Sequence, residues 1–370
     1  MSRLEELIEK LCPDGVEYKK LGFLCEITKG IQFNKADMND EGTYPVINGG
    51  INPSGYIEQY NQDENTITIS QGGASAGFVN WLTVKFWAGA HCYIVKPSDT
   101  ILNRYTYHFI KSQEYKLQEC QYGAGIPALA KSTVEALKIP VPPLEVQSEI
   151  VRILDNFTEL TAELTAELTA RKKQYEHYRD ELLTFGDEVE YINLGELADI
   201  KTGIKPEEIF ESLGEYEYIN AGTTNSGYVN DYNCEDAVTT PSRGQGGIGF
   251  VGYQKDKFWL GPLCYRIQSK NKEKIFNKYL YYYLLHNNHL ILGIKKEGGV
   301  PAVNRVDLEK IVVETPPLEE QQRIVDILDR FDKLCNDISE GLPAEIEARQ
   351  KQYEYYRDKL LSFKSLSLNS

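Results

Sequence analysis

The sequence contains an internal duplication, which constrains the fold more than any short motif does. The segment Pro142–Gln147 (Pro-Pro-Leu-Glu-Val-Gln) returns as Pro316–Gln321 (Pro-Pro-Leu-Glu-Glu-Gln), and the residues that follow it return as well. Further along, Gln174–Asp180 matches Gln352–Asp358. A repeat of this length predicts two similar structural units. Two similar units in turn suggest two similar sites, held apart by whatever joins them.

The repeat extends into the rest of each half. Short framework motifs recur in the same order, while the stretches between them differ. The pairs are Ser54–Tyr56 with Ser226–Tyr228, Gly77–Val79 with Gly249–Val251, Lys85–Trp87 with Lys257–Trp259, Cys92–Tyr93 with Cys264–Tyr265, and Gly125–Ala128 with Gly299–Ala302. We expect a duplicated scaffold with four segments: an N-terminal helix and first globular domain (1–141), a central helix (142–186), a second globular domain (187–315), and a distal helix with a tail (316–370).

Composition sets limits on the class of protein. A length of 370 residues allows two or three domains, each with its own core. No apolar run approaches the ~20 residues that span a membrane, and we expect no signal peptide, because Ser2–Lys10 is charged throughout. The seven cysteines form no Cys-x-x-Cys pair and no Cys/His cluster, so we expect reduced, mostly buried thiols and a cytoplasmic protein.

The net charge is −15, which excludes a protein that binds nucleic acid through its overall charge. Much of the excess acid falls outside the two globular domains, and neither domain is basic. Any affinity for DNA would therefore come from local patches or from the charge of a partner.

Two long helices are expected from the spacing of apolar residues. Between Leu144 and Phe185 there is no Gly or Pro, and apolar residues recur at helical spacing. The second copy runs from Leu318 to Phe363. Helices this long pack on each other or on a partner, so a purely structural coiled coil and a docking platform both remain open.

Each long helix carries one irregularity. The first contains two consecutive Thr-Ala-Glu-Leu tetrads, residues 161–164 and 165–168, and each tetrad adds about one turn, or ~6 Å. In the second, Gly341 and Pro343 are poor helix formers, and we expect a kink or break around residues 341–344.

The globular domains are predicted to be mixed α/β and rich in strands. Buried strands are expected at residues 66–70 and 92–95, and a strand followed by a turn is expected at residues 46–50 and 218–222. Helices are expected late in each domain, at residues 104–117 and 278–291. The 25 tyrosines serve either as half-buried core residues or in recognition.

The sequence shows no catalytic constellation and no metal-binding pattern. Gly244–Gly249 fits Gly-x-Gly-x-x-Gly, but no amphipathic helix follows it and the other copy fails the pattern, which argues against a dinucleotide site. A glycine-rich loop whose backbone approaches a group such as a phosphodiester is the better interpretation. Pro13-Asp14 with Glu17 and Lys19 only loosely resembles a nuclease site.

Taken together, these residues resemble the specificity subunit of Type I restriction–modification enzymes. The features that carry the resemblance are the paired Pro-Pro-Leu-Glu-x-Gln helix starts, the Tyr-x-x-Tyr-Arg-Asp-x-Leu-Leu helix ends, the Thr-Ala-Glu-Leu tetrads and the paired Gly-Ile/Val-Pro-Ala turns. The resemblance covers essentially the whole chain.

The resemblance implies two target-recognition domains, each of which reads one half of a split DNA sequence. The two conserved helices would form an antiparallel coiled coil that sets the spacer and docks two methyltransferase subunits. Those subunits bind S-adenosylmethionine and methylate adenine, and restriction subunits that use ATP and magnesium would join them. The chain itself would catalyse nothing, and no cofactor or metal would bind it directly.

DNA-binding residues are predicted in polar, glycine-rich loops at corresponding places in the two halves. They are Lys29, Gln32, Lys35, Ser70, Gln71 and Ser75 in the first domain, and Lys201, Thr202, Lys205, Ser242, Arg243 and Gln245 in the second. The repeat predicts that Ser70, Gln71 and Ser75 correspond to Ser242, Arg243 and Gln245. Arg and Gln suit bidentate contacts with guanine and adenine edges. The alternative is that each is simply a solvated loop residue.

The long helices supply two further groups of candidates. Partner docking is predicted for Tyr175, Tyr178, Tyr353 and Tyr356, which could instead hold the two helices together. The spacer residues are Thr161, Leu164, Thr165 and Leu168. The segment Ser2–Leu11 is similar to the end of the first helix and is expected to complete the distal helix pair, which would make the chain pseudo-circular.

Two other functions compete with this interpretation. One is a coiled-coil scaffold whose two domains bind proteins rather than DNA, which the acidic charge favours. The other is a self-contained DNA-modifying enzyme, against which the missing catalytic motifs argue.

Overall fold

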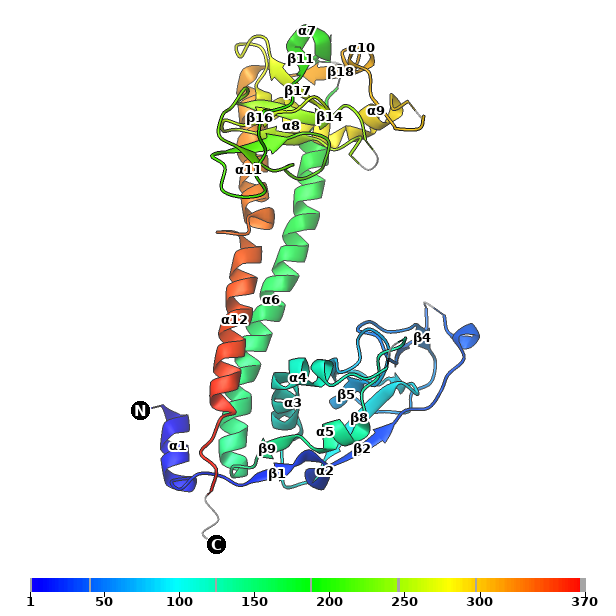
Figure 1. Ribbon diagram of the computed structural model, residues 1–370, viewed down its shortest axis with the longest axis vertical. Coiled ribbons are helices and arrows are strands. Elements are labelled where there is room, and N and C mark those ends of the chain that lie inside the picture. The colour runs from blue at the N-terminus through cyan, green and yellow to red at the C-terminus, as the bar shows by residue number, and fades with distance from the viewer. Residues whose placement is uncertain are drawn as a thin grey trace. The chain divides into compact units, whose positions relative to one another are not determined.

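The structure is a computed structural model that describes residues 2–39, 41–123, 125–186, 188–244, 247–296 and 298–366. The chain divides into two compact units, residues 1–165 with 345–370 and residues 166–344. Each unit contains one globular domain and parts of the long helices, and each is described by itself (Figure 1). No helix in these described ranges is both long and apolar enough to cross a membrane.

Three small sheets build the globular domain of the first unit. The largest sheet is antiparallel, with the strand order β2 (Cys25–Lys29), β8 (Cys92–Pro97), β5 (Thr66–Ser70), β6 (Val79–Leu82). The second contains β4 (Tyr56–Ile57), β3 (Tyr44–Ile47) and β7 (Trp87–Ala88), with β3 parallel to β7. A separate pair joins β1 (Tyr18–Lys20) to β9 (Lys138–Pro140), so the first and last strands of the domain are neighbours.

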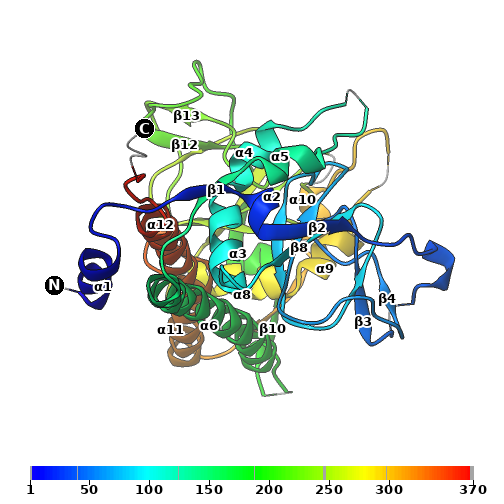
Figure 2. The ribbon, with the colours of Figure 1, turned by 90° about the horizontal axis from the view of Figure 1, so that it is seen from below.

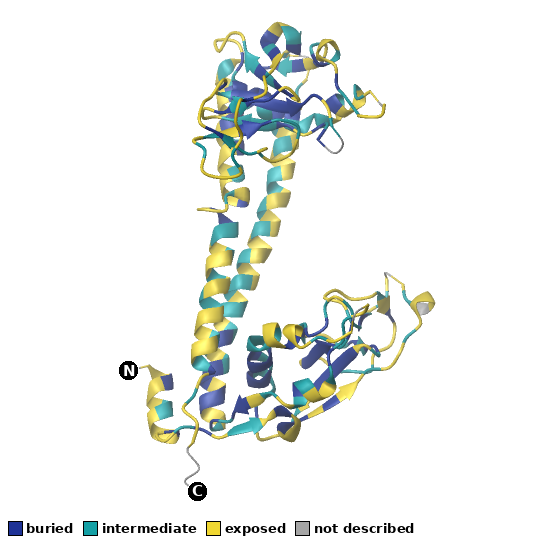
Figure 3. Cartoon of the chain, viewed as in Figure 1, coloured by how far each residue is buried: buried dark blue, intermediate teal, exposed yellow. Residues whose placement is uncertain are grey.

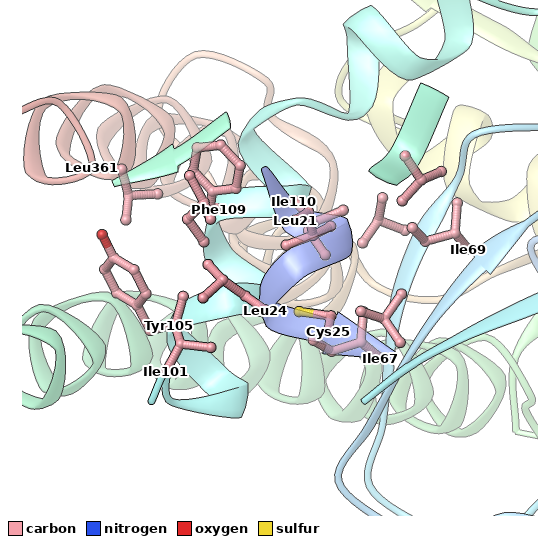
Figure 4. Close-up of a cluster of buried hydrophobic side chains, with 14 of the residues drawn as sticks. Leu21, Leu24, Cys25, Ile67, Ile69, Ile101, Tyr105, Phe109, Ile110 and Leu361 are labelled. Atoms are coloured by element: carbon pink, nitrogen blue, oxygen red, sulfur yellow. The ribbon is translucent and has the colours of Figure 1, made fainter. Parts of the chain in front are cut away.

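Short helices complete this domain. They are α2 (Leu21–Leu24), the 3-10 helix η1 (Lys35–Asp37), α3 (Asn103–Ser112), α4 (Glu114–Glu119) and α5 (Lys131–Glu135). The single helix expected at residues 104–117 is wrong, because Gln113 leaves helical geometry at φ −96° and ψ 3°. Tyr105 and Ile110 of α3 pack in one buried cluster with Ile67 and Ile69 of β5 (Figure 4).

The second unit repeats this topology. Its sheets have the orders β11-β17-β14-β15, β13-β12-β16 and β10-β18. The strands are β10 (Glu190–Asn193), β11 (Ala198–Thr202), β12 (Tyr216–Ile219), β13 (Tyr228–Val229), β14 (Ala237–Pro241), β15 (Gly252–Gln254), β16 (Trp259–Leu260), β17 (Cys264–Ser269) and β18 (Val312–Thr315). The helices are α7 (Leu194–Leu197), α8 (Asn277–His286), α9 (Asn288–Gly293) and α10 (Arg305–Leu308). The tandem duplication and the mixed α/β class are confirmed.

The helix expected at residues 278–291 is also interrupted. Asn287, at φ −97° and ψ 31°, separates α8 from α9. The interruption therefore occurs at the corresponding place in both domains, and both periodicity-based predictions missed it, because apolar spacing continues across a single non-helical residue.

The central helix α6 (Leu144–Leu182) is continuous over 39 residues, or about 58 Å at 1.5 Å per residue. It ends three residues before the expected Phe185. In the first unit its opening turns pack with the end of α12 (Leu342–Leu360), and in the second unit its last turns pack with α11 (Leu318–Asn336). In each unit the paired helices run antiparallel. Burial is deepest near the start of α6, and Leu164 and Leu168 in its middle are half-buried (Figure 3).

The expected break in the second long helix is confirmed, and it lies slightly earlier than Pro343. The chain leaves helical geometry between Asn336 and Leu342. Asp337 Oδ1 accepts hydrogen bonds from the backbone N–H groups of Ser339 (2.7 Å) and Glu340 (3.1 Å), which stabilises the turn. Pro343 is the second residue of α12, where its missing N–H is not needed.

The two ends of the chain meet within the first unit. The backbone N–H of Val16 donates to Lys364 O (2.8 Å), and that of Leu366 donates to Val16 O (2.9 Å). Helix α1 (Arg3–Leu11) lies on the opposite side of the α6–α12 pair from α3 (Figures 1 and 2), and Leu4 shares a core with Leu361. The N-terminal helix thus completes the distal helix pair, as expected.

Candidate nucleic-acid interface

Several loops of the first domain meet beyond the end of β5. The backbone N–H of Gln71 donates to His91 O (2.8 Å), and Gln71 O accepts from Leu129 N–H (2.8 Å). The Gln71 side chain also contacts the ring of His91, with Oε1 3.2 Å from Nδ1. Gln71 is therefore bonded to two other loops by its backbone, while its side chain remains partly exposed.

The second domain builds the same frame from different residues. Ser242 N–H donates to Leu263 O (2.9 Å), and Ser242 O accepts from Val303 N–H (2.9 Å). Ser242 thus makes the backbone bonds that Gln71 makes in the first domain. The next residue, Arg243, is exposed and forms a β-bridge with Ala302.

This correspondence corrects our alignment of the two loops by one residue. In the sheets, Ser70 pairs with Cys92 and Pro241 pairs with Cys264, so Ser70 corresponds to Pro241 rather than Ser242. Gln71 then corresponds to Ser242, and Gly72 to Arg243. The sequence comparison matched serine with serine, whereas strand register decides which residues occupy the same place.

The glycine-rich loops are bonded through their glycine backbones to the Gly-Ile/Val-Pro-Ala turns. Gly73 N–H donates to Pro127 O (2.8 Å) and Gly244 N–H donates to Pro301 O (3.1 Å). Both glycines have positive φ, at +83° and +135°. The backbone of each glycine-rich loop is thus bonded to a turn of its own domain. The segment after Gly249 leads into strand β15, not a helix, which agrees with rejecting a dinucleotide site.

A second group of candidate residues follows strands β2 and β11. Strand register places Lys29 opposite Tyr93 and Thr202 opposite Tyr265, so Lys29 and Thr202 correspond. Lys201 is paired with Asp199 (2.9 Å), and this ion pair lowers the pKa of the Asp199 carboxyl. The positive charge of Lys201 is thus partly neutralised within the chain.

The turns after these strands are fixed by the repeated tryptophans. Trp87 Nε1 donates to Ile31 O (2.9 Å) and Trp259 Nε1 donates to Ile204 O (2.8 Å). These anchors were missed in the sequence, although the repeated Lys-Phe-Trp motif contained the signal. They hold the turns that carry Gln32 and Lys205.

The remaining candidates differ in how accessible they are. Lys35 starts η1 and is exposed, and Lys205 is exposed beside a cavity of about 480 Å³ that Glu207, Glu208 and Asp231 also line. Ser75 is half-buried, whereas Ser70 and Ser242 are only 5% and 9% exposed. Gln245 lies outside the described residues. The exposed candidates are Lys29, Gln32, Lys35, Lys201, Thr202, Lys205 and Arg243, and Gln71 is partly exposed.

The four tyrosines predicted for docking all contact residues of their own unit. Tyr353 OH lies 3.0 Å from His108 Nδ1, and Tyr356 stacks on Phe157 with ring centroids 5.4 Å apart. Tyr175 and Tyr178 both lie against Phe331. Burial raises the pKa of Tyr175 to about 12. Tyr178 and Tyr356 keep over a third of their surface exposed, and Tyr355, which we did not single out, is 62% exposed.

The spacer residues lie along the middle of α6. Thr161 donates its hydroxyl to Phe157 O (2.9 Å) and Thr165 donates its hydroxyl to Thr161 O (2.8 Å). Both threonines thus bond back to their own helix, and Leu164 and Leu168 are half-buried. Within the described residues, no cluster of three or more His, Cys, Asp or Glu side chains is arranged to hold a metal ion.

Two copies of one scaffold carry different polar side chains on matching loops, which is the architecture of a recognition protein with two separate binding surfaces. Comparison with known proteins identifies what it recognises. The family model described as "Type I restriction modification DNA specificity domain" matches residues 13–171 and again residues 186–348.

Relatives agree over nearly the full length. A putative type I restriction enzyme specificity subunit of Haemophilus influenzae is 31% identical over 97% of this chain and 98% of its own. A type I restriction enzyme specificity subunit of Escherichia coli is 35% identical over 98% of this chain and 97% of its own. The crystal structure of an S subunit from M. genitalium shares the fold, with a TM-score of 0.72, 23% identity, and coverage of 94% of this chain and 96% of that one.

The chain therefore belongs to the family of Type I restriction–modification DNA specificity subunits. Its function is to provide DNA sequence specificity within such a system. The comparisons give no support to a scaffold that binds only proteins.

Proposed function

We propose that each globular domain reads one half of a bipartite DNA target through the loops beyond β5 and β14. The observation that supports this proposal is that the corresponding loops of the two domains have the same backbone hydrogen bonds. Gln71 and Ser242 make the same backbone bonds, while the side chains presented there differ. A constant backbone with changed side chains lets two domains read different bases in the same manner. Arg243 suits a bidentate contact with guanine and Gln71 one with adenine.

We propose that Lys29, Gln32, Lys35, Lys205 and Thr202 contact the DNA near those loops, mainly at phosphates. Lys35 and Lys205 are exposed. Lys201 would reach a phosphate only by giving up part of its ion pair with Asp199. Since the whole chain carries a net charge of −15, much of the favourable electrostatic attraction to DNA would come from partner subunits.

The long helices are proposed to dock two methyltransferase subunits. The middle of α6 keeps Leu164 and Leu168 half-buried, and Tyr355 of α12 is exposed, so apolar surface remains for a partner to cover. The methyltransferase subunits would bind S-adenosylmethionine and methylate adenine. Restriction subunits with ATP and magnesium would complete the assembly. This chain would take part in the cytoplasm as a subunit that catalyses nothing itself.

Purification of this chain with a cognate methyltransferase tests the proposal. We expect light scattering to give the mass of one 42.1 kDa chain plus two methyltransferase subunits. Methyl transfer to DNA should require both proteins. Methyl transfer by this chain alone, or a stable complex with one methyltransferase subunit that is fully active, would contradict the proposal.

A further inference from the structure

Two buried glutamines connect the long helices to the recognition domains. Gln147, in the first turn of α6, is fully buried. Its Oε1 accepts from Leu102 N–H (2.8 Å), and its Nε2 donates to Pro142 O (2.8 Å). Leu102 directly precedes α3, whose N-terminus has no side-chain cap of its own. Gln147 thus binds the free amide at the start of a domain helix.

Gln321 repeats this arrangement in the second unit. It is fully buried, and its Oε1 accepts from Phe276 N–H (3.0 Å) directly before α8. Its Nε2 donates to Pro316 O (2.8 Å) and Lys274 O (3.0 Å). These bonds give a physical role to the glutamine of each repeated Pro-Pro-Leu-Glu-x-Gln segment.

A second contact follows eight residues later on each helix. Asp155 accepts from Arg104 Nε (2.7 Å) and His108 Nε2 (2.9 Å), both on α3. Asp329 accepts from the hydroxyl of Tyr282 and pairs with Lys278 (3.2 Å), both on α8. Eight residues span about 12 Å of helix. One contact would leave a pivot, whereas two contacts this far apart fix the angle between the helices.

The domain helices transmit that angle to the rest of each domain. Tyr105 of α3 is fully buried and donates to Pro140 O (3.1 Å) in β9. Tyr279 of α8 is likewise fully buried and donates to Glu314 O (2.8 Å) in β18. A rotation of α3 or α8 would therefore carry its domain with it.

We propose that Gln147 and Gln321 are positioning residues that fix each recognition domain on its long helix and so make the spacer length of the DNA target strict. The inference rests on the proposed function, in which each domain reads one half-site. If a domain is free to rotate on its helix, the two readout surfaces can meet half-sites at more than one separation.

The test uses the full chain with its methyltransferase and plasmids that carry both half-sites at the natural spacer and at spacers one base pair shorter or longer. Gln321→Leu keeps the side-chain volume and removes all three hydrogen bonds. We expect the preference for the natural spacer to fall at least about tenfold, because the loss of even one buried hydrogen bond has an effect of this order. Gln147→Leu should act in the same way from the other domain.

Gln322→Leu is the matched control. Gln322 is the next residue and is exposed, and among the described residues its side chain bonds along its own helix to Asp326 (2.8 Å). The Gln322→Leu substitution should leave the preference for the natural spacer unchanged. Tyr282→Phe, which removes only the hydroxyl that contacts Asp329, should relax the preference and serves if Gln321→Leu does not fold.

Loss of stability alone would lower methylation equally at every spacer. An unchanged spacer preference in a folded Gln321→Leu or Tyr282→Phe protein would overturn the proposal. A wild-type protein that needs no second half-site would instead contradict the proposed function, so the two failures are distinguishable.

Discussion

Asp155 contacts two side chains of α3, Arg104 and His108, and His108 can gain a proton as the pH falls. His108 is fully buried between Asp155 and Tyr353, and burial lowers its pKa, as do the nearby Arg104 and Arg357, against the raising effect of Asp155. In the second unit the corresponding residue is Tyr282, which makes its bond to Asp329 without a group that gains a proton in this range. The second domain thus shows a tyrosine at the position that the histidine occupies in the first.

We expect the first unit to lose stability as the pH falls through about 6.5. A lowered folded-state pKa means that the unfolded chain binds the proton more readily, so His108 favours folding above the ordinary histidine pKa and opposes it below. The pKa of Asp155 is also lowered: burial raises it, but hydrogen bonds from His108 and Arg104 outweigh burial, and this contribution is lost only at more acid pH. Thermal unfolding measured between pH 5.5 and 7.5 checks the slope.

His108→Tyr is the informative variant for this slope. Tyrosine can donate to Asp155 as Tyr282 does to Asp329, so unfolding near pH 6 should become less sensitive to pH. His108→Phe should lose the bond and lower the stability at every pH. An equal pH slope in wild type and His108→Tyr would show that His108 is not the group responsible.

Arg243 and Gln71 are each predicted to read bases in one half-site of the DNA target. Arg243→Ala should relax the sequence requirement in one half-site and leave the other unchanged, at a cost of ~1–3 kcal/mol in discrimination. Gln71→Ala should do the reverse. Methylated motifs mapped for each variant decide this. A change in both half-sites from either single substitution would be inconsistent with one domain reading one half.

At the scale of elements, the sequence predicted those helices, strands and breaks that depend on the spacing of apolar residues along the chain. Both long helices, the strand at Thr66–Ser70 and the break near Gly341 follow from local spacing and from residues that cannot continue a helix. Strand register and the single-residue interruptions at Gln113 and Asn287 do not, because they depend on contacts between distant segments. The predicted correspondence between the two candidate loops was one residue out for this reason.

The break between α11 and α12 depends on Gly341. A Cβ at this position would lie 2.6 Å from the carbonyl oxygens of both Asp337 and Lys333. We expect Gly341→Ala to destabilise the second unit by about 1–3 kcal/mol through overpacking. Gly298→Ala is the control, because a Cβ there meets no atom of the described part of the chain within 4 Å. Denaturant unfolding of both variants gives the comparison, and equal stabilities would show that the turn can relax.

The tetrads give a prediction about the spacer. Deletion of residues 165–168 removes about one turn, or ~6 Å, of α6, which corresponds to roughly one to two base pairs of DNA. We expect the unread spacer to shorten while both half-sites stay the same. A methylome with an unchanged spacer and full activity would rule out this role for the tetrads.

At the scale of the whole molecule, each globular domain has a tyrosine near its start that bonds to the end of a long helix. Tyr18 donates its hydroxyl to Phe363 O (2.9 Å) at the start of the first domain, and Tyr191 donates to Gly186 O (3.4 Å) at the start of the second. Each domain thus begins beside the end of a long helix, although only the second is joined to it covalently. Two equivalent domains on equivalent helices suit a target made of two separate half-sites.

The most direct test is methylome sequencing of a host free of DNA methylation that expresses this chain with its methyltransferase, compared with the methyltransferase alone. We expect methylated adenines in a motif of two short specified parts separated by a fixed unread spacer, present only with this chain. A continuous motif, or no chain-dependent methylation although the two proteins co-purify, would contradict the account.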